Sequence, residues 1–102
     1  MISLLTVPKA QDRLREHLKA RRLLLGFTQE GLANRAGVSL PTLRKFEQKG
    51  VISLESFLKL SMVLNALEPL VAALEPKQEE FSSIDDVLSN KKSKPRKTGW
   101  RS

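Results

Sequence analysis

The fold is decided by the stretch FTQEGLANRAGVSLPTLRKFEQKG, residues 27–50, in which two short helical patterns flank a glycine. Thr28 can cap the first helix, and Ser39 can cap the second. Between the two helices, Gly37 supplies the positive φ that a tight turn requires. Ala33 stands where the helices would cross, and a larger side chain would push them apart. The spacing therefore predicts a helix-turn-helix unit.

Apolar residues in this stretch recur at helical spacing, which predicts helices over residues 28–36 and 40–48. These side chains are expected to pack the turn and the second helix onto the rest of the domain. They are Leu32, Ala33, Ala36, Val38, Leu43 and Phe46. A helix-turn-helix built in this way presents its second helix to a major groove.

Helical spacing also dominates outside this unit, and no long stretch alternates with period two. Three further helices are predicted, over residues 7–25, 54–64 and 67–74. Thr6 and Ser53 are available as caps for the first two of these. Leu14, Leu18 and Leu25 share one face of the helix over residues 7–25 by helical spacing. The fold class expected is an all-α, five-helix domain with short connections.

Charge is distributed unevenly along the 102 residues. The formal net charge of +7 combines +6 over residues 1–50, −5 over residues 51–90 and +6 over residues 91–102. Basic blocks at both ends favour a polyanionic partner, whereas the acidic middle block faces water or a protein. We expect a folded domain over residues 1–75 and a flexible extension over residues 76–102, basic from residue 91.

Composition argues against several functional classes. The chain has no cysteine, which excludes a disulfide scaffold and thiolate metal sites, and its one histidine, His17, cannot form a histidine cluster. The adjacent Asp85 and Asp86 give no fixed acid–base geometry. No segment approaches the roughly 18 apolar residues of a membrane helix. We expect a cytoplasmic, nucleoid-associated bacterial protein that is not an enzyme and uses no cofactor or metal.

The pattern TQE-x-LA-x-x-x-GVS-x-x-TL-x-x-FE over residues 28–47 resembles the lambda-repressor-like, or XRE-type, helix-turn-helix family. The resemblance covers roughly residues 8–75 and implies a DNA-binding transcriptional regulator. More narrowly, ISLESFLKLSMVLNAL at residues 52–67, with a basic tail ending near a tryptophan, resembles HipB-type antitoxins. That resemblance implies the repressor of a HipBA-like or HipBST-like toxin–antitoxin operon, with a kinase-like toxin as its partner.

A cap at Ser39 puts Leu40 and Pro41 in the first turn of the second helix, closest to the base edges. Neither side chain donates a hydrogen bond, so direct readout shifts to polar neighbours, and DNA shape gains weight. The expected base contacts are Ser39, Leu40, Pro41, Thr42, Arg44 and Lys45.

We expect a phosphate at the start of the helix over residues 28–36, because the helix dipole favours an anion there. The family resemblance implies the same site. The expected phosphate contacts are Thr28, Gln29, Arg35 and Lys49. Glu47 resembles a structural family position, which implies that it pairs with a nearby basic group, on the first helix.

A homodimer is expected, because two-fold symmetry matches a palindromic operator of double-stranded DNA. The expected dimer contact consists of Leu64, Leu67, Leu70, Val71 and Leu74. The expected partner-binding tail residues are Ile84, Val87, Leu88 and Trp100. The basic tail either tracks DNA phosphates or docks on a partner through its tryptophan. Two other functions stay open: a protein-interaction module with little DNA role, and a stand-alone phage-type regulator.

Overall fold

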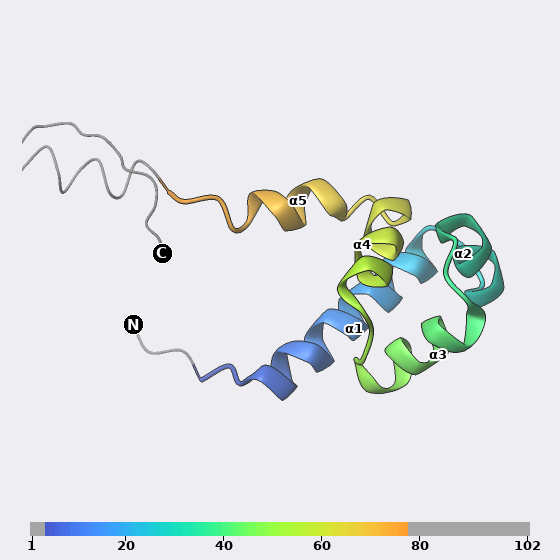
Figure 1. Cartoon of the computed structure of the whole chain (residues 1–102), viewed down its shortest axis with the longest axis horizontal. Coiled ribbons are helices and arrows are strands. Elements are labelled where there is room, and N and C mark those ends of the chain that lie inside the picture. The colour runs from blue at the N-terminus through green and yellow to red at the C-terminus, as the bar shows by residue number, and fades with distance from the viewer. Residues whose placement is uncertain (1–3, 78–102) are drawn as a thin grey trace, which may run out of the picture.

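The computed structural model describes residues 4–77, and within that range the chain forms five α-helices and no strand (Figure 1). They are α1 (Val7–Leu24), α2 (Gln29–Ala36), α3 (Leu40–Lys49), α4 (Leu54–Val63) and α5 (Leu67–Ala72). The all-α, five-helix prediction is confirmed, and each boundary lies within two residues of the predicted one. Of the extension predicted over residues 76–102, residues 78–102 lie outside the described residues.

Side-chain caps begin four of the five helices. The hydroxyls of Thr6, Thr28, Ser39 and Ser53 each accept a hydrogen bond from the backbone N–H three residues later. Such a cap satisfies one of the N–H groups that a helix start leaves unpaired, and it stabilises the fold by about 1 kcal/mol. Only α5 lacks one, since Ala66 precedes it. The starts of α1, α2, α3 and α4 are therefore fixed by local sequence.

The core lies between α2, α3 and α4, with α1 packed against α3. Its largest fully buried apolar side chains are Leu32, Leu43, Leu60 and Leu64. Removing a leucine side chain from water stabilises a fold by roughly 1.5–3 kcal/mol. The six apolar residues that the helix-turn-helix pattern assigned to the interior are all buried. The core therefore holds α2 and α3 in a fixed relative orientation.

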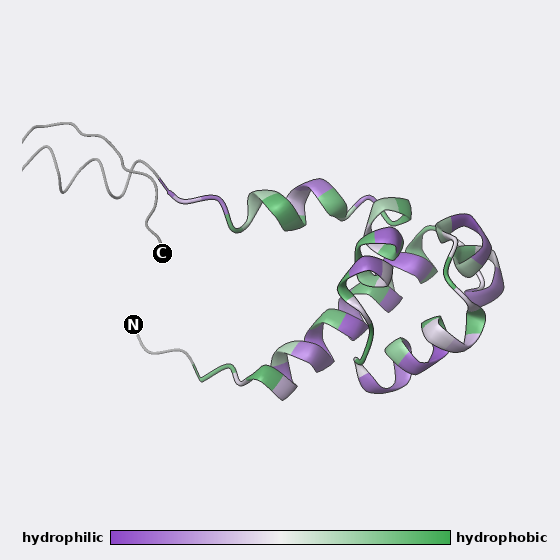
Figure 2. Cartoon of the chain, viewed as in Figure 1, coloured by the Kyte–Doolittle hydropathy of each residue, from purple (hydrophilic) through white to green (hydrophobic). Residues whose placement is uncertain are grey.

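Two helices extend away from this core. In Figure 1 the first half of α1 and the whole of α5 project from the compact part of the molecule. Of the three leucines that share one face of α1, Leu18 is buried, but Leu14 is 41% exposed and Leu25 is 45% exposed. Leu14 and Leu25 are exposed because α1 extends beyond the body it packs on and Leu25 lies at its capping turn. Figure 2 shows that α5 carries mostly apolar residues.

Gly50 ends α3 at a place where the chain approaches α1 closely. Its φ is +74°, and a Cβ there would lie 3.1 Å from the backbone oxygen of Gln11. Gly37, which ends α2, has a similar φ of +71° but open space around it. The two glycines therefore share the left-handed conformation and differ in the space that surrounds them.

Gly50→Ala is expected to lower the free energy of unfolding by about 2–4 kcal/mol, because strain at positive φ adds to a clash with α1. Gly37→Ala is the matched control, and its cost should be confined to about 1–2 kcal/mol of backbone strain. Urea unfolding of both variants measures the difference. Equal losses would contradict the close approach.

Candidate nucleic-acid interface

The exposed side of the helix-turn-helix is formed by α2, the turn at Gly37 and α3. The Gly37 amide donates to carbonyls of α2, and the Val38 amide donates to the Ala33 oxygen at 3.0 Å. Ala33 and Val38 are buried at this junction. The turn is thus closed by backbone hydrogen bonds and filled by two small apolar side chains, which fixes the position of α3.

The first turn of α3 is arranged as its cap predicts. The Ser39 Oγ accepts from the Thr42 amide at 3.2 Å and donates to the Thr42 Oγ1 at 2.7 Å. Pro41 is exposed and Leu40 is half-buried. The outward surface of this turn is therefore mainly apolar, and the Thr42 hydroxyl hydrogen is the polar donor it retains.

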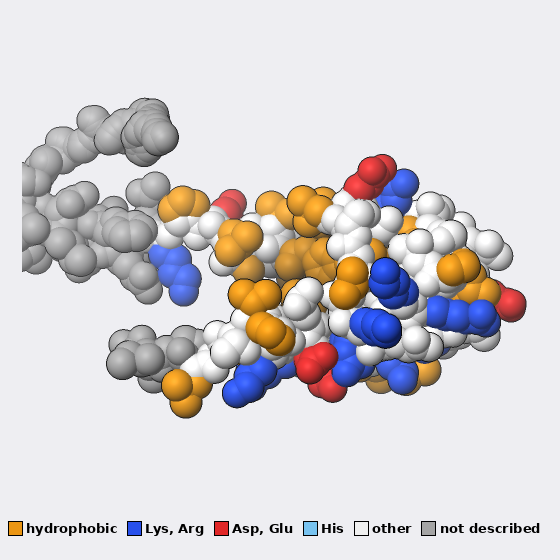
Figure 3. All heavy atoms as spheres, turned by 60° about the horizontal axis from the view of Figure 1, so that its bottom comes forward, with side chains coloured by type: hydrophobic (Ala, Val, Ile, Leu, Met, Phe, Trp, Pro, Cys, Tyr) orange, Lys and Arg blue, Asp and Glu red, His pale blue; other side chains and the backbone are white. Residues whose placement is uncertain are grey.

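Basic side chains follow one turn further along α3. Arg44, Lys45 and Lys49 are all exposed. Figure 3 shows Lys and Arg side chains gathered on the face of the body that carries α2 and α3. Cations of this kind suit phosphates and guanine edges alike.

The predicted phosphate residues on α2 differ in their surroundings. Thr28 is exposed, and its hydroxyl oxygen accepts from the Gly31 amide at 2.9 Å. The guanidinium of Arg35 lies 4.9 Å from the centre of the Phe27 ring, in cation–π geometry. Gln29 is half-buried, and its side chain is directed at α3. Thr28 and Arg35 therefore remain accessible, whereas the Gln29 amide is engaged within the protein.

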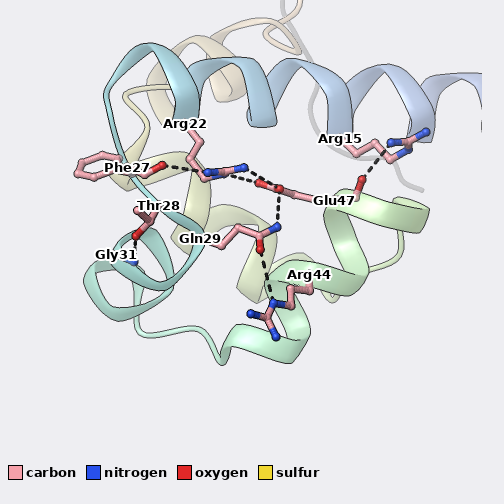
Figure 4. A network of polar contacts seen from close by, with 8 residues as sticks. All are labelled: Arg15, Arg22, Phe27, Thr28, Gln29, Gly31, Arg44 and Glu47. Atoms are coloured by element: carbon pink, nitrogen blue, oxygen red, sulfur yellow. Dashed lines mark hydrogen bonds and ion pairs between the residues drawn. The ribbon is translucent and has the colours of Figure 1, made fainter.

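A buried ion pair joins α1 to α3 behind this surface (Figure 4). The Arg22 Nε donates to the Glu47 Oε2 at 2.7 Å, and its Nη2 donates to the Glu47 Oε1 at 3.1 Å. The side chains are 8% and 5% exposed. The Arg22 Nη1 also donates to the Phe27 oxygen at 2.9 Å. The prediction that Glu47 pairs with a basic group of the first helix is confirmed.

Two further side chains of α1 satisfy backbone groups at the end of α3. The Arg15 Nη1 donates to the Glu47 oxygen at 2.9 Å, and the Gln11 Nε2 donates to the Gly50 oxygen at 3.4 Å. A helix end leaves carbonyl oxygens unpaired, and cations there are favourable. Sequence reasoning missed Arg15 and Gln11. Their spacing of one helical turn on the predicted α1 was the available signal, but it did not identify their partners.

The predicted partner-binding tail residues lie outside the described residues: Ile84, Val87, Leu88 and Trp100. Asp85, Asp86 and the basic block from residue 91 lie outside them as well. The roles assigned to these residues stay predictions.

A capped helix-turn-helix with an exposed, basic second helix defines a DNA-binding transcription regulator. The chain belongs to the XRE-type helix-turn-helix family, whose sequence model, described as helix-turn-helix, matches residues 18–70. This family binds double-stranded DNA and is not an enzyme family. A comparison with curated proteins finds no match to the chain. None of the described helices is both long and apolar enough to cross a membrane.

Proposed function

We propose that this regulator is a sequence-specific repressor that binds a palindromic operator as a homodimer, with α3 of each copy in the major groove. The observation that carries the proposal is the exposure of Arg44, Lys45 and Lys49 on a helix whose position is fixed by the core. Selection from a randomised DNA pool tests it. The full chain should enrich one palindromic sequence, and enrichment of no sequence would refute it.

The proposed base contacts are divided between apolar and polar groups. Leu40 and Pro41 contact thymine methyls or fill groove space, since neither can donate a hydrogen bond. Because the Ser39 hydroxyl is used within the cap, most polar readout is assigned to Arg44 and Lys45, with Thr42 as a lesser donor. Sequence preference at each half-site is therefore modest, and DNA shape contributes the rest.

The proposed phosphate contacts surround this helix. Thr28 and the first amides of α2 approach one phosphate, where the helix dipole favours an anion. Arg35 and Lys49 extend the contact along the backbone, since both are exposed. Gln29 is also a predicted phosphate contact, and its side-chain amide already has partners within the protein. We therefore assign any phosphate contact of Gln29 to its backbone N–H.

The proposed dimer contact is formed by α5. Leu67 and Leu70 are half-buried, while Val71 is 61% exposed and Leu74 is 86% exposed. Leu64 was predicted to belong to this contact, and that is wrong: it is 1% exposed and packs within the core. A short helix with apolar residues on most of its surface is unstable in water unless another surface covers it. A second copy supplies that surface under two-fold symmetry.

Val71→Asp is expected to convert the dimer to a monomer, because a carboxylate at the contact would be buried without a partner. Affinity for a palindromic duplex should fall by roughly a hundredfold, since two linked half-sites become independent. Sedimentation and DNA titration measure the two effects. Val7→Asp is the matched control, because Val7 is 74% exposed at the far end of α1. Unchanged sedimentation of Val71→Asp would place the dimer contact elsewhere.

We further propose that the repressor is the antitoxin of a toxin–antitoxin operon and binds a kinase-like toxin. The support is the resemblance of residues 52–67 to HipB-type antitoxins, together with a lone tryptophan, Trp100, in the basic tail. A purely electrostatic tail has no need of an aromatic anchor. Trp100→Ala should weaken binding to a toxin encoded in the same operon and leave DNA binding intact. An operon without such a toxin would favour a stand-alone regulator instead.

A further inference from the structure

The polar network of Figure 4 continues beyond the buried ion pair to the DNA-facing surface. The Gln29 Nε2 donates to the Glu47 Oε1 at 2.9 Å. On its other side, the Gln29 Oε1 accepts from the Arg44 Nε at 3.5 Å. One glutamine side chain therefore connects a buried carboxylate with an exposed arginine of α3.

The chemistry of Glu47 decides which way the Gln29 amide is oriented. A carboxylate paired with a guanidinium has acceptor oxygens only, so it takes the NH2 group of the amide and rejects the carbonyl. The amide oxygen must then face away from Glu47. Its outward direction leads to Arg44, whose guanidinium carries donors only and can donate to that oxygen. The orientation of the amide is thus set from the core side.

We propose that Gln29 is a positioning residue for sequence readout: held by the Arg22–Glu47 pair, it orients the guanidinium of Arg44 toward the base edges. The inference rests on the proposed function, and it gives Gln29 a different role from a side-chain phosphate contact. Leu40, at the start of α3, has an apolar side chain, so it cannot hydrogen-bond to a base-contacting residue and hold it in place. The α2 glutamine supports Arg44 instead.

The contact with Gln29 leaves the terminal nitrogens of the Arg44 guanidinium free to contact a base. Arg44 uses its Nε toward Gln29, and both terminal nitrogens stay available for a bidentate contact with guanine O6 and N7. A distance of 3.5 Å is long for an N–H···O hydrogen bond, so the contact restrains the side chain weakly. The restraint lowers the conformational entropy that a long arginine loses when it binds. Its removal should reduce discrimination more than overall affinity.

A double-mutant cycle tests this role with Gln29→Met, Arg44→Ala and the double variant in the full chain. The probes are the duplex that the wild-type protein selects from a randomised pool, and a scrambled duplex of the same composition. The measured quantity is selectivity, the ratio of the two affinities. Where Arg44 is present, Gln29→Met should lower selectivity roughly threefold to tenfold. In the Arg44→Ala background, Gln29→Met should leave selectivity unchanged.

Asn34→Leu is the matched control, because it removes an exposed amide from the same helix. Its effect should add to that of Arg44→Ala without coupling. Circular dichroism checks the fold of each variant, and Gln29→Asn, which keeps the amide but is too short to join both partners, replaces Gln29→Met if that variant unfolds.

Three results would overturn the inference. An equal loss of affinity for both duplexes, with or without Arg44, would make Gln29 a phosphate contact. Unchanged selectivity in Gln29→Met would show that Arg44 needs no support. If the wild-type protein selects no sequence from the pool, the proposed function fails first and the positioning role fails with it.

Discussion

Glu47→Leu is expected to lower the free energy of unfolding by about 3–5 kcal/mol, because it leaves the Arg22 guanidinium buried without its carboxylate. Arg22 keeps its hydrogen bond to the Phe27 oxygen but loses two charged ones, at 2.7 Å and 3.1 Å. Gln29 loses an acceptor at the same time. Small domains are stable by only about 5–15 kcal/mol, so the loss is a large fraction of the total. Urea unfolding measures it.

The companion variants separate a buried charge from lost packing. Arg22→Met combined with Glu47→Leu should recover most of the stability, since apolar residues of similar volume commonly replace a buried ion pair without loss. Glu55→Leu is the matched surface control, because Glu55 pairs with Lys59 at 3.3 Å and its side chain is 79% exposed. That change should cost at most about 1 kcal/mol. A loss for Glu47→Leu no larger than for Glu55→Leu would show that the buried pair contributes little.

Local features of this chain were predictable because each depends on a few neighbouring residues. Ser39 and Thr28 cap their helices, and Gly37 adopts a positive φ. Each feature is set by residues within one helical turn, and other residue types at these positions would lower the stability of the helix end. The buried positions of the helix-turn-helix, such as Leu43 and Phe46, were predictable because helical spacing is also a local property of the sequence.

Features that depend on distant contacts were harder to predict. Leu64 and Val71 are both apolar residues at helical spacing, yet one lies in the core and the other is exposed, because α5 projects beyond the body. The position of Gln29 at the start of α2 predicts a phosphate contact. Its side chain has other partners because Glu47, far along the sequence, comes within 2.9 Å. Only the packed structure brings those groups together.

The basic residues of α3 give the second large effect, on DNA rather than on stability. Arg44→Ala and Lys45→Ala are each expected to weaken binding to the selected duplex by about 1–3 kcal/mol if the side chain reads a base. The double variant should lose about the sum, unless the two side chains share one contact. Both are exposed, and the backbone of α3 stays fixed by its buried face, so the fold should be unaffected.

Salt dependence distinguishes the roles of these two side chains. A residue that neutralises one phosphate contributes about 0.9 to the slope of log affinity against log salt, and its loss weakens all sequences alike. We expect Lys45→Ala to change this slope, and Arg44→Ala to change sequence preference as well. Lys59→Ala is the control of equal charge, since Lys59 lies on α4, which packs behind α2. If the double variant binds the selected duplex as tightly as the wild-type chain, α3 does not enter the groove and the DNA-binding surface lies elsewhere.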